Sequence, residues 1–134
     1  MDLQELSIKL ADHQREGMGF ESFLIAGEQD VLQVVVEGFD EMPIFVTITE
    51  EQMLCISYLF DKSELKDGVN AELNETLLQL NVPMPLSAFS IIDSKYSIFG
   101  ALSVNSSFDD IAHELVTLAD NAIDALEAIE DFLR

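Results

Sequence analysis

Basic residues are scarce in this chain. Only 6 of its 134 residues are lysine or arginine, against 26 aspartates and glutamates, so the formal net charge is −20. A surface of this sign repels nucleic acid and anionic lipid, and it favours basic partners. The composition therefore argues against a nucleic-acid-binding protein, because no basic patch is present. We expect a protein partner or client, with basic residues favoured.

Cysteine and long apolar runs are also nearly absent. Cys55 is the single cysteine, which excludes an internal disulfide. It lies in the apolar run Met53–Ile56, and we expect a small core residue there rather than a nucleophile. No stretch approaches the roughly eighteen apolar residues of a membrane span, and the first residues do not resemble a signal peptide. The expected location is the cytoplasm, without direct membrane insertion.

The sequence contains no motif that indicates catalysis or ligand binding. His13 and His113 each lack a second histidine or cysteine at metal-ligand spacing. A phosphate loop, a dinucleotide fingerprint and a nucleophile elbow are all missing. We therefore predict no catalytic residue, no cofactor and no metal. An enzyme stays open as an alternative, because carboxylates from separate elements can meet in space.

The apolar periodicity predicts one α+β domain that spans residues 1–134. At 49% apolar residues the chain is not expected to be disordered. Helices are predicted at residues 2–16, 70–81 and 107–133, and strands at residues 20–26, 31–37, 44–49, 53–60, 87–92 and 96–104. The order α-β-β-β-β-α-β-β-α has no βαβα alternation, so it favours a mainly antiparallel sheet with helices packed on it.

A proline corner joins the middle helix to the fifth strand. Pro83 pushes Val82 out of the α region, so the helix should end near Asn81. The Pro-Met-Pro segment should be extended and stiff, and we expect Met84 and Leu86 to be buried and to pin the corner. An alternative is that the corner forms a rigid rim of a groove for a partner.

The last predicted helix has the clearest apolar stripe. At about 1.5 Å per residue it would be about 40 Å long, and we expect the sheet and the middle helix to leave its end uncovered. One interpretation is a helix that covers the sheet, and another is a helix whose end binds a second copy or a client. The first helix could instead cover this end. The predicted interface comprises Ile123, Leu126, Ile129, Phe132 and Leu133.

The same pattern predicts which side chains point into the core. These are the apolar positions that repeat along the helices and alternate along the last strands. They comprise Leu77, Leu80, Ile91, Phe99, Leu102, Ile111, Leu115 and Leu118.

Three stretches resemble a family of small acidic bacterial proteins of unknown function, the YjfI-like family. The first consists of Leu73, Asn74, Leu77 and Leu78, and the others are Pro83–Ser87 and Phe99–Ser103. The resemblance covers nearly the full length and implies no catalytic residues. Members resemble one another in lying near a gene for a homologue of phage-shock protein A, which implies a link to envelope stress.

The element order is also similar to that of type III secretion chaperones and YbjN-like proteins. That resemblance implies a small sheet with helices on it, a tendency to dimerise, and binding of partner segments. The chain departs from the chaperones by one additional predicted strand before the middle helix. Likeness of fold does not establish function.

The leading functional hypothesis is a non-catalytic protein-interaction module of the small chaperone or adaptor kind. It is based on the net charge, the missing catalytic motifs and the long apolar stripe, and it includes a homodimer as one outcome. The alternatives are the enzyme with converging carboxylates and an acidic DNA mimic. The mimic would require the acids to be arrayed on one face.

Overall fold

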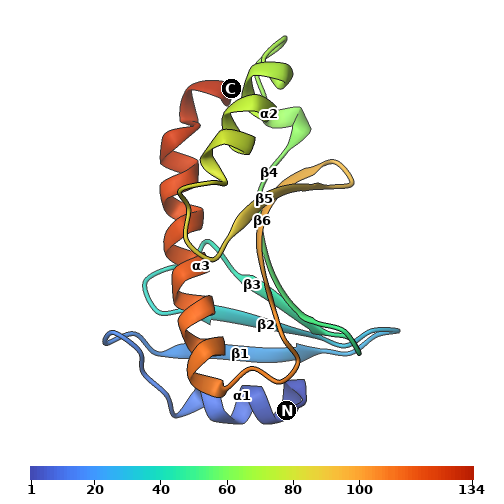
Figure 1. Ribbon diagram of the computed structural model, residues 1–134, viewed down its shortest axis with the longest axis vertical. Coiled ribbons are helices and arrows are strands. Elements are labelled where there is room, and N and C mark those ends of the chain that lie inside the picture. Colours follow the sequence, from blue (N-terminus) through green and yellow to red (C-terminus); the bar gives the residue numbers. More distant parts are fainter.

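The computed structural model describes residues 1–134 and contains three α-helices and six strands (Figure 1). The helices are α1 (Leu3–Ala11), α2 (Asn70–Leu80) and α3 (Phe108–Ala128). The strands are β1 (Phe20–Ile25), β2 (Val31–Val36), β3 (Ile44–Ile48), β4 (Met53–Asp61), β5 (Ala88–Ile92) and β6 (Lys95–Leu102). Two short 3₁₀ helices, η1 (Lys62–Glu64) and η2 (Glu130–Phe132), complete the chain. The predicted order of helices and strands is confirmed.

The six strands form one sheet in the order β1-β2-β3-β4-β6-β5, and every neighbouring pair is antiparallel. Short turns join most of the neighbours, as in β5–β6, where Ile92 pairs with Lys95 and a two-residue turn lies between them. Asp93 has a φ of 54° in this turn, which aspartate tolerates better than most residues. The predicted α+β class with an antiparallel sheet is confirmed.

All three helices lie against the same face of the sheet. Helix α3 runs along the whole molecule, from α1 at one end to α2 at the other (Figure 1). Burial alternates along β2: Leu32, Val34 and Val36 are fully buried beneath the helices, and the residues between them are half-buried. Together with Leu6 and other apolar residues of α1 and α3, they form the main core.

Helix α1 is shorter than the predicted 2–16. Asp2 caps it, with Oδ1 accepting a hydrogen bond from the Glu5 amide at 2.8 Å, but the helix ends at Ala11. Glu16 and Gly17 both have positive φ and form a tight turn, which pairs Arg15 with Met18. Gly17 closes this turn because glycine adopts a positive φ without steric cost.

Helix α3 also ends earlier than predicted. Ser107 caps its start, with Oγ accepting a hydrogen bond from the Asp110 amide at 3.1 Å. The helix ends at Ala128, and η2 then turns the chain so that Leu133 pairs with Leu65. The reason is a second core cluster. The turn directs the chain terminus over this cluster and covers it. This cluster comprises Phe60, Leu65, Leu73, Leu77, Tyr96 and Ile129.

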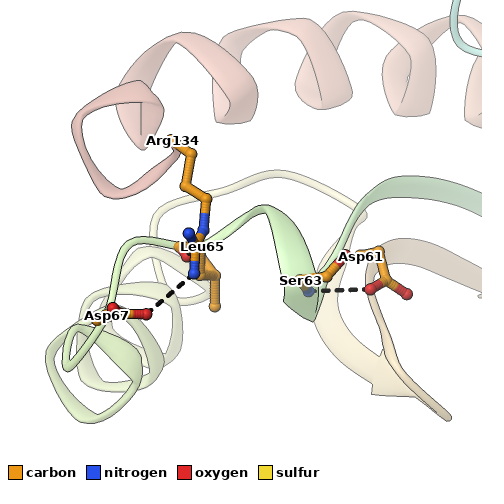
Figure 2. Close-up of polar contacts among 5 residues, drawn as sticks. All are labelled: Asp61, Ser63, Leu65, Asp67 and Arg134. Carbon is orange, nitrogen blue, oxygen red and sulfur yellow. Dashed lines mark hydrogen bonds and ion pairs between the residues drawn. The ribbon is translucent and has the colours of Figure 1, made fainter.

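Arg134 holds this terminus in place (Figure 2). Its Nε donates to the carbonyl oxygen of Leu65 at 2.7 Å, and its Nη2 contacts Oδ1 of Asp67 at 2.9 Å. On the other side of η1, Asp61 accepts hydrogen bonds from Ser94 Oγ at 2.7 Å and from the Ser63 amide at 2.9 Å. These hydrogen bonds lower the pKa of Asp61 to about 2.

The proline corner confirms the predicted helix end but not the predicted burial of Leu86. Helix α2 ends at Leu80, with Asn81 as its C-cap. Leu86 has a φ of 64° in a tight turn, closed by the Ser87 amide donating to the Pro85 carbonyl, and this turn leaves its side chain exposed. Met84 is half-buried against the main core, as expected in part.

The predicted core residues of α3 are confirmed, and those of the last strands are partly wrong. Ile111, Leu115 and Leu118 are fully buried, as is Leu77 to within a few per cent. Leu80 and Leu102 are half-buried. Ile91 is exposed because it lies in the edge strand β5. Phe99 is half-buried on the face away from the helices, because its neighbours Ile98 and Gly100 occupy the helix side.

Leu115 gives a test of this arrangement. Replacing it with alanine should lower the free energy of unfolding by about 2–5 kcal/mol, because the side chain is fully buried in a packed layer. Urea unfolding measures the change. Ile8→Ala is the matched control, since Ile8 is also on a helix but exposed, and it should change stability by less than about 0.5 kcal/mol. Equal losses in both variants would contradict the predicted packing.

Candidate protein-binding surface

The face of the sheet opposite the helices is uncovered. Contacts of the helices all reach the other face: Ser7 of α1 contacts Ser22, and Asn74 of α2 accepts a hydrogen bond from the Tyr96 hydroxyl. Helix α3 covers that same side over β2, β4 and β6. We call the uncovered side the open face. It is defined by the strand residues that alternate with the buried ones.

One row of the open face crosses all six strands. Antiparallel pairing places the side chains of directly opposite residues on the same face, about 4.5–5.5 Å apart at Cβ. The register joins Phe23 to Gln33, Gln33 to Phe45, Phe45 to Ile56, Ile56 to Phe99, and Phe99 to Ala88. Neighbouring rows join Ile25 to Val31, Thr47 to Leu54 and Ala101, and Tyr58 to Ser97 and Ser90.

These rows contain no charged residue, and aliphatic and aromatic side chains predominate in them. Phe23 is 55% exposed and Tyr58 is 40% exposed, and the rings of Phe45 and Tyr58 lie 5.7 Å apart. An antiparallel sheet with one solvated face normally presents polar side chains on that face. In a chain with 26 acids, central rows without charge are a departure from that rule and mark an interaction surface.

Acidic residues surround the central rows of the open face, and those that lie on the face, Glu21 of β1 and Asp61 of β4, stand near strand ends. Exposed acids occupy the turns at the ends of the strands, such as Glu28 between β1 and β2 and Glu50 between β3 and β4. At one corner, Glu21 and Val35 of the open face also line a wide, solvent-open hollow of about 1050 Å³. The acids of this hollow are Asp12, Glu21, Glu37 and Asp40.

The acids of the hollow give that corner a negative potential. Glu37 has a hydrogen-bond partner within the chain, since its Oε1 accepts a hydrogen bond from the Gly19 amide at 2.9 Å. His13 packs edge-on against Phe108, with ring centroids 4.8 Å apart. His113 is exposed on α3 and far along the chain from His13. No three histidine, cysteine, aspartate or glutamate side chains gather in a way that could hold a metal ion.

Glu114 is the only buried carboxylic acid in the structure. It lies on the sheet side of α3, is 3% exposed, and its Oε1 has no hydrogen-bond partner. Its carboxyl group packs against the backbone of Gly100 so closely that a Cβ atom on that residue would overlap it. Burial raises the pKa of Glu114 to about 7. Gly100, in the Phe99–Ser103 stretch, is therefore the residue that makes room for this acid.

Cys55 lies opposite Gly100 in the β4–β6 pairing and is fully buried. Burial, together with the Glu114 carboxylate, raises the pKa of its thiol to about 12. The thiol is therefore protonated at neutral pH and a weak nucleophile. The prediction of a small core residue is confirmed.

The predicted interface residues surround the end of α3. Ile129 is fully buried in the second core cluster, and Leu126, Phe132 and Leu133 pack against that cluster. Ile123 packs against the main core. The first helix, which was the alternative cover, does not reach this cluster. The cover comes from α2 and from the residue after η1, since Leu73, Leu77 and Leu65 belong to the same cluster. An interface at this end stays a prediction, and Ile129 is available to it only if the terminus opens.

The open face is not among the sites predicted from the sequence. The pattern that indicates it is in β2 and β4, which are largely apolar at both alternating sets of positions. Three helices can cover only one side of such a sheet.

Comparison with known proteins assigns the chain to a family. The model of a family described as "Uncharacterized protein conserved in bacteria", DUF2170, matches residues 1–133. The chain belongs to this family. The YjfI protein of Escherichia coli K12 is 30% identical over 112 residues, which are 81% of this chain and 83% of YjfI, and the YjfI protein of strain O157:H7 matches equally well. The predicted YjfI-like membership is confirmed.

Solved structures show the fold that this DUF2170 protein shares. YbjN of E. coli superposes with a TM-score of 0.62 at 16% identity, covering 98% of this chain and 91% of YbjN. A chain of the heterodimeric ExoU–SpcU complex, from the type III secretion system of Pseudomonas aeruginosa, superposes with a TM-score of 0.56 at 11% identity, covering 92% and 93%. The predicted likeness to type III secretion chaperones and YbjN is confirmed for the fold. None of the helices has both the length and the apolar character needed to cross a membrane.

The charge distribution gives a prediction on salt. The structure holds one ion pair, Arg134 with Asp67, and both side chains are largely exposed. Most acids therefore repel one another without a partner, and added salt screens this repulsion. The thermal midpoint at neutral pH should rise between low and moderate salt. A flat midpoint across that range, measured by circular dichroism in sodium chloride, would contradict the prediction.

Glu114 gives a prediction on pH. Its carboxyl has an ordinary pKa of 4.5 and a folded pKa of about 7, so the protonated acid is favoured by the folded state. Stability from this group is fully present below about pH 4.5 and is lost as the pH rises through 7, because the fold must then hold a buried charge. Relative to wild type, Glu114→Gln should therefore gain stability between pH 4.5 and pH 8.

Urea unfolding at several pH values measures this difference. Glu127→Gln is the control, since Glu127 is an exposed acid on the same helix. Its stability should follow that of wild type across the range. Parallel profiles of wild type and Glu114→Gln would show that the carboxyl finds a partner in solution.

Proposed function

We propose that this protein is a non-catalytic protein-binding module of the chaperone or adaptor kind, which holds an apolar segment of a partner protein on its open face. The observation that carries the proposal is the row of uncharged side chains across all six strands. Phe23, Phe45 and Phe99 lie in that row, and aromatic side chains dominate the energetics of protein interfaces.

The position of the acids indicates the chemistry of the partner. A segment that crosses the open face reaches the corner where Glu21 lies beside the acidic hollow. Acids at the rim attract basic residues and steer the encounter, while the apolar rows contribute most of the affinity. The expected partner segment therefore combines apolar residues with lysine or arginine at its end.

The fold comparisons support this class of function without deciding it. A chain of a solved heterodimeric complex has this fold, which shows that the architecture is compatible with a bound protein. The enzyme alternative has less support, because the single buried acid, Glu114, faces glycine backbone and not a second carboxylate. The DNA-mimic alternative would need acids across one face, and the open face has none in its central rows.

The family resemblance suggests a first partner to try. A homologue of phage-shock protein A, and through it a link to envelope stress, stays a prediction. It enters the experiment below as one named candidate beside proteins captured from the native cell.

The test is binding by variants of the open face. Phe23→Ser and Tyr58→Ser should each weaken binding of the captured partner about tenfold or more, or about 1.4 kcal/mol, because each removes exposed apolar area from the contact. Titration calorimetry with the purified partner measures the affinity. Binding should also show a negative heat-capacity change, as burial of apolar surface requires.

Leu24→Ser is the matched control for Phe23→Ser. Leu24 is the next residue of β1 and is 45% exposed, but it points to the helix side of the sheet. It should bind like wild type. A partner that binds Leu24→Ser as weakly as Phe23→Ser, or that tolerates both open-face variants, would overturn the proposed site.

A further inference from the structure

Glu114 has no role in the proposed function, and its surroundings are unusual for an acid. Its side chain is 3% exposed, and its Oε1 is buried without a hydrogen-bond partner. A buried carboxylate normally has a cation or several donors beside it, because moving a bare charge out of water is costly. The one ion pair of the chain joins Arg134 to Asp67 and does not involve this acid. Glu114 is therefore held between α3 and the sheet by packing alone.

The residues that the sheet presents to α3 offer no charge that could balance an ionised Glu114. Helix α3 packs against β2, β4 and β6. Among the main-core residues of these strands the only titratable group is the Cys55 thiol, which lies opposite Gly100 in the β4–β6 pairing. The other main-core residues of these strands and of α1 are Leu32, Val34, Val36, Met53, Ile98, Leu3, Leu6 and Leu10.

The charged residues on and around the first turns of α3 do not balance Glu114 either. Asp110, one turn earlier, and His113, the preceding residue, are both exposed. Lys9 and Arg15 contact only the first two residues of the helix, more than one turn before Glu114. Burial without a compensating charge raises the pKa of Glu114 to about 7.

The two halves of α3 are anchored differently. The second half is tied to the proline corner by Asn121, whose Nδ2 donates to the Pro85 carbonyl at 2.9 Å, and its end packs into the second core cluster. The first half has one hydrogen bond to a distant part of the chain, from Arg15 to the Asp109 carbonyl at 3.5 Å. The half that contains Glu114 is therefore the half that can leave the sheet while the rest stays packed.

We propose that Glu114 is the acid of a proton-controlled switch: the first half of α3 lies on the sheet while this carboxyl is protonated, and it opens locally when the carboxyl ionises. Opening takes the carboxylate into water and uncovers Cys55, and the second half of α3 stays in place. Burial of an acid alone would make the whole fold pH-dependent, whereas this device confines the opening to one part of the molecule. The proposal does not rest on the proposed function.

The rate at which dithiodipyridine labels Cys55 tests the proposal, because the folded chain buries this thiol completely. The labelling rate of the urea-unfolded chain at each pH corrects for the thiolate fraction. The carboxyl ionises with a pKa of 4.5 in the open form and of about 7 in the closed form. The corrected rate should therefore rise about tenfold or more between pH 5 and pH 7 and become level above about pH 8.

Two glutamine variants assign the effect to Glu114. Glu114→Gln should abolish the rise, because its amide stays neutral in both forms. Glu127→Gln should keep the rise, since Glu127 is an exposed acid on the same helix. The proposal is overturned if the corrected rate of wild type does not change with pH, or if it rises equally in Glu114→Gln.

The urea dependence of labelling in wild type separates local opening from complete unfolding and needs no variant. Opening of half a helix exposes little surface, so the labelling rate at pH 7 should hardly change at low urea concentrations. Labelling through complete unfolding would rise steeply with urea, with the slope of the equilibrium unfolding curve. That steep slope, present from the lowest urea concentration upwards, would show that Cys55 is uncovered only when the whole fold opens, and it would overturn the proposal.

Discussion

The structure depends on the packing of one long helix against one face of a six-stranded sheet. Helix α3 places Ile111, Leu115 and Leu118 over buried strand residues such as Val34 and Cys55. With α1 at one end and α2 at the other, this layer uses every helix of the chain (Figure 1). The opposite face therefore has no cover from within the molecule. Its chemistry is left to solvent or to another molecule.

The charge of the chain is distributed in agreement with this arrangement. With one exposed ion pair, the 26 acids have almost no internal partners, so they favour positions where water solvates them. Most of them occupy turns and the outer side of the helices, and the central rows of the open face contain none. Glu114 is the exception. It fits beneath α3 because Gly100 has no side chain to occupy the same space. This distribution of charge keeps the protein dispersed in water, while defined areas of its surface remain uncharged.

Most of the fold could be predicted from the sequence, because the pattern of apolar residues is local. Alternation along the strands and the Ser107 cap of α3 gave the element order and one helix boundary within a residue. The ends of α1 and α3 could not be predicted in the same way. Both helical patterns continue past the last helical residue, at Ala11 and Ala128. A tight turn at Glu16–Gly17 follows the end of α1, and the pairing of Leu133 with Leu65 follows the end of α3. Neither feature changes the apolar periodicity from which the helices were predicted.

The candidate site was harder to predict for a related reason. A stripe of apolar residues on a helix looks the same whether it meets a partner or the rest of the chain, so Ile129 was placed at an interface although the second core cluster buries it. The strand pattern distinguishes the two faces, since Phe45 and Phe99 alternate with buried residues and cannot share their face. The three helices cover only one of these faces, so the other is the uncovered side.

The open face and the apolar area around α2 and β5, where Leu78, Val82 and Ile91 are exposed, differ in charge. The open face is bordered by acids and ends at the acidic hollow near Glu21, so charge there discriminates in favour of a basic segment. Residues 76–92, which include the area around α2 and β5, contain no charged side chain, so charge does not discriminate there. The two areas are also separate in the sheet, because the exposed apolar residues of β1 lie at one edge and those of β5 at the other. A molecule bound on the open face would thus leave the exposed apolar residues around α2 and β5 uncovered.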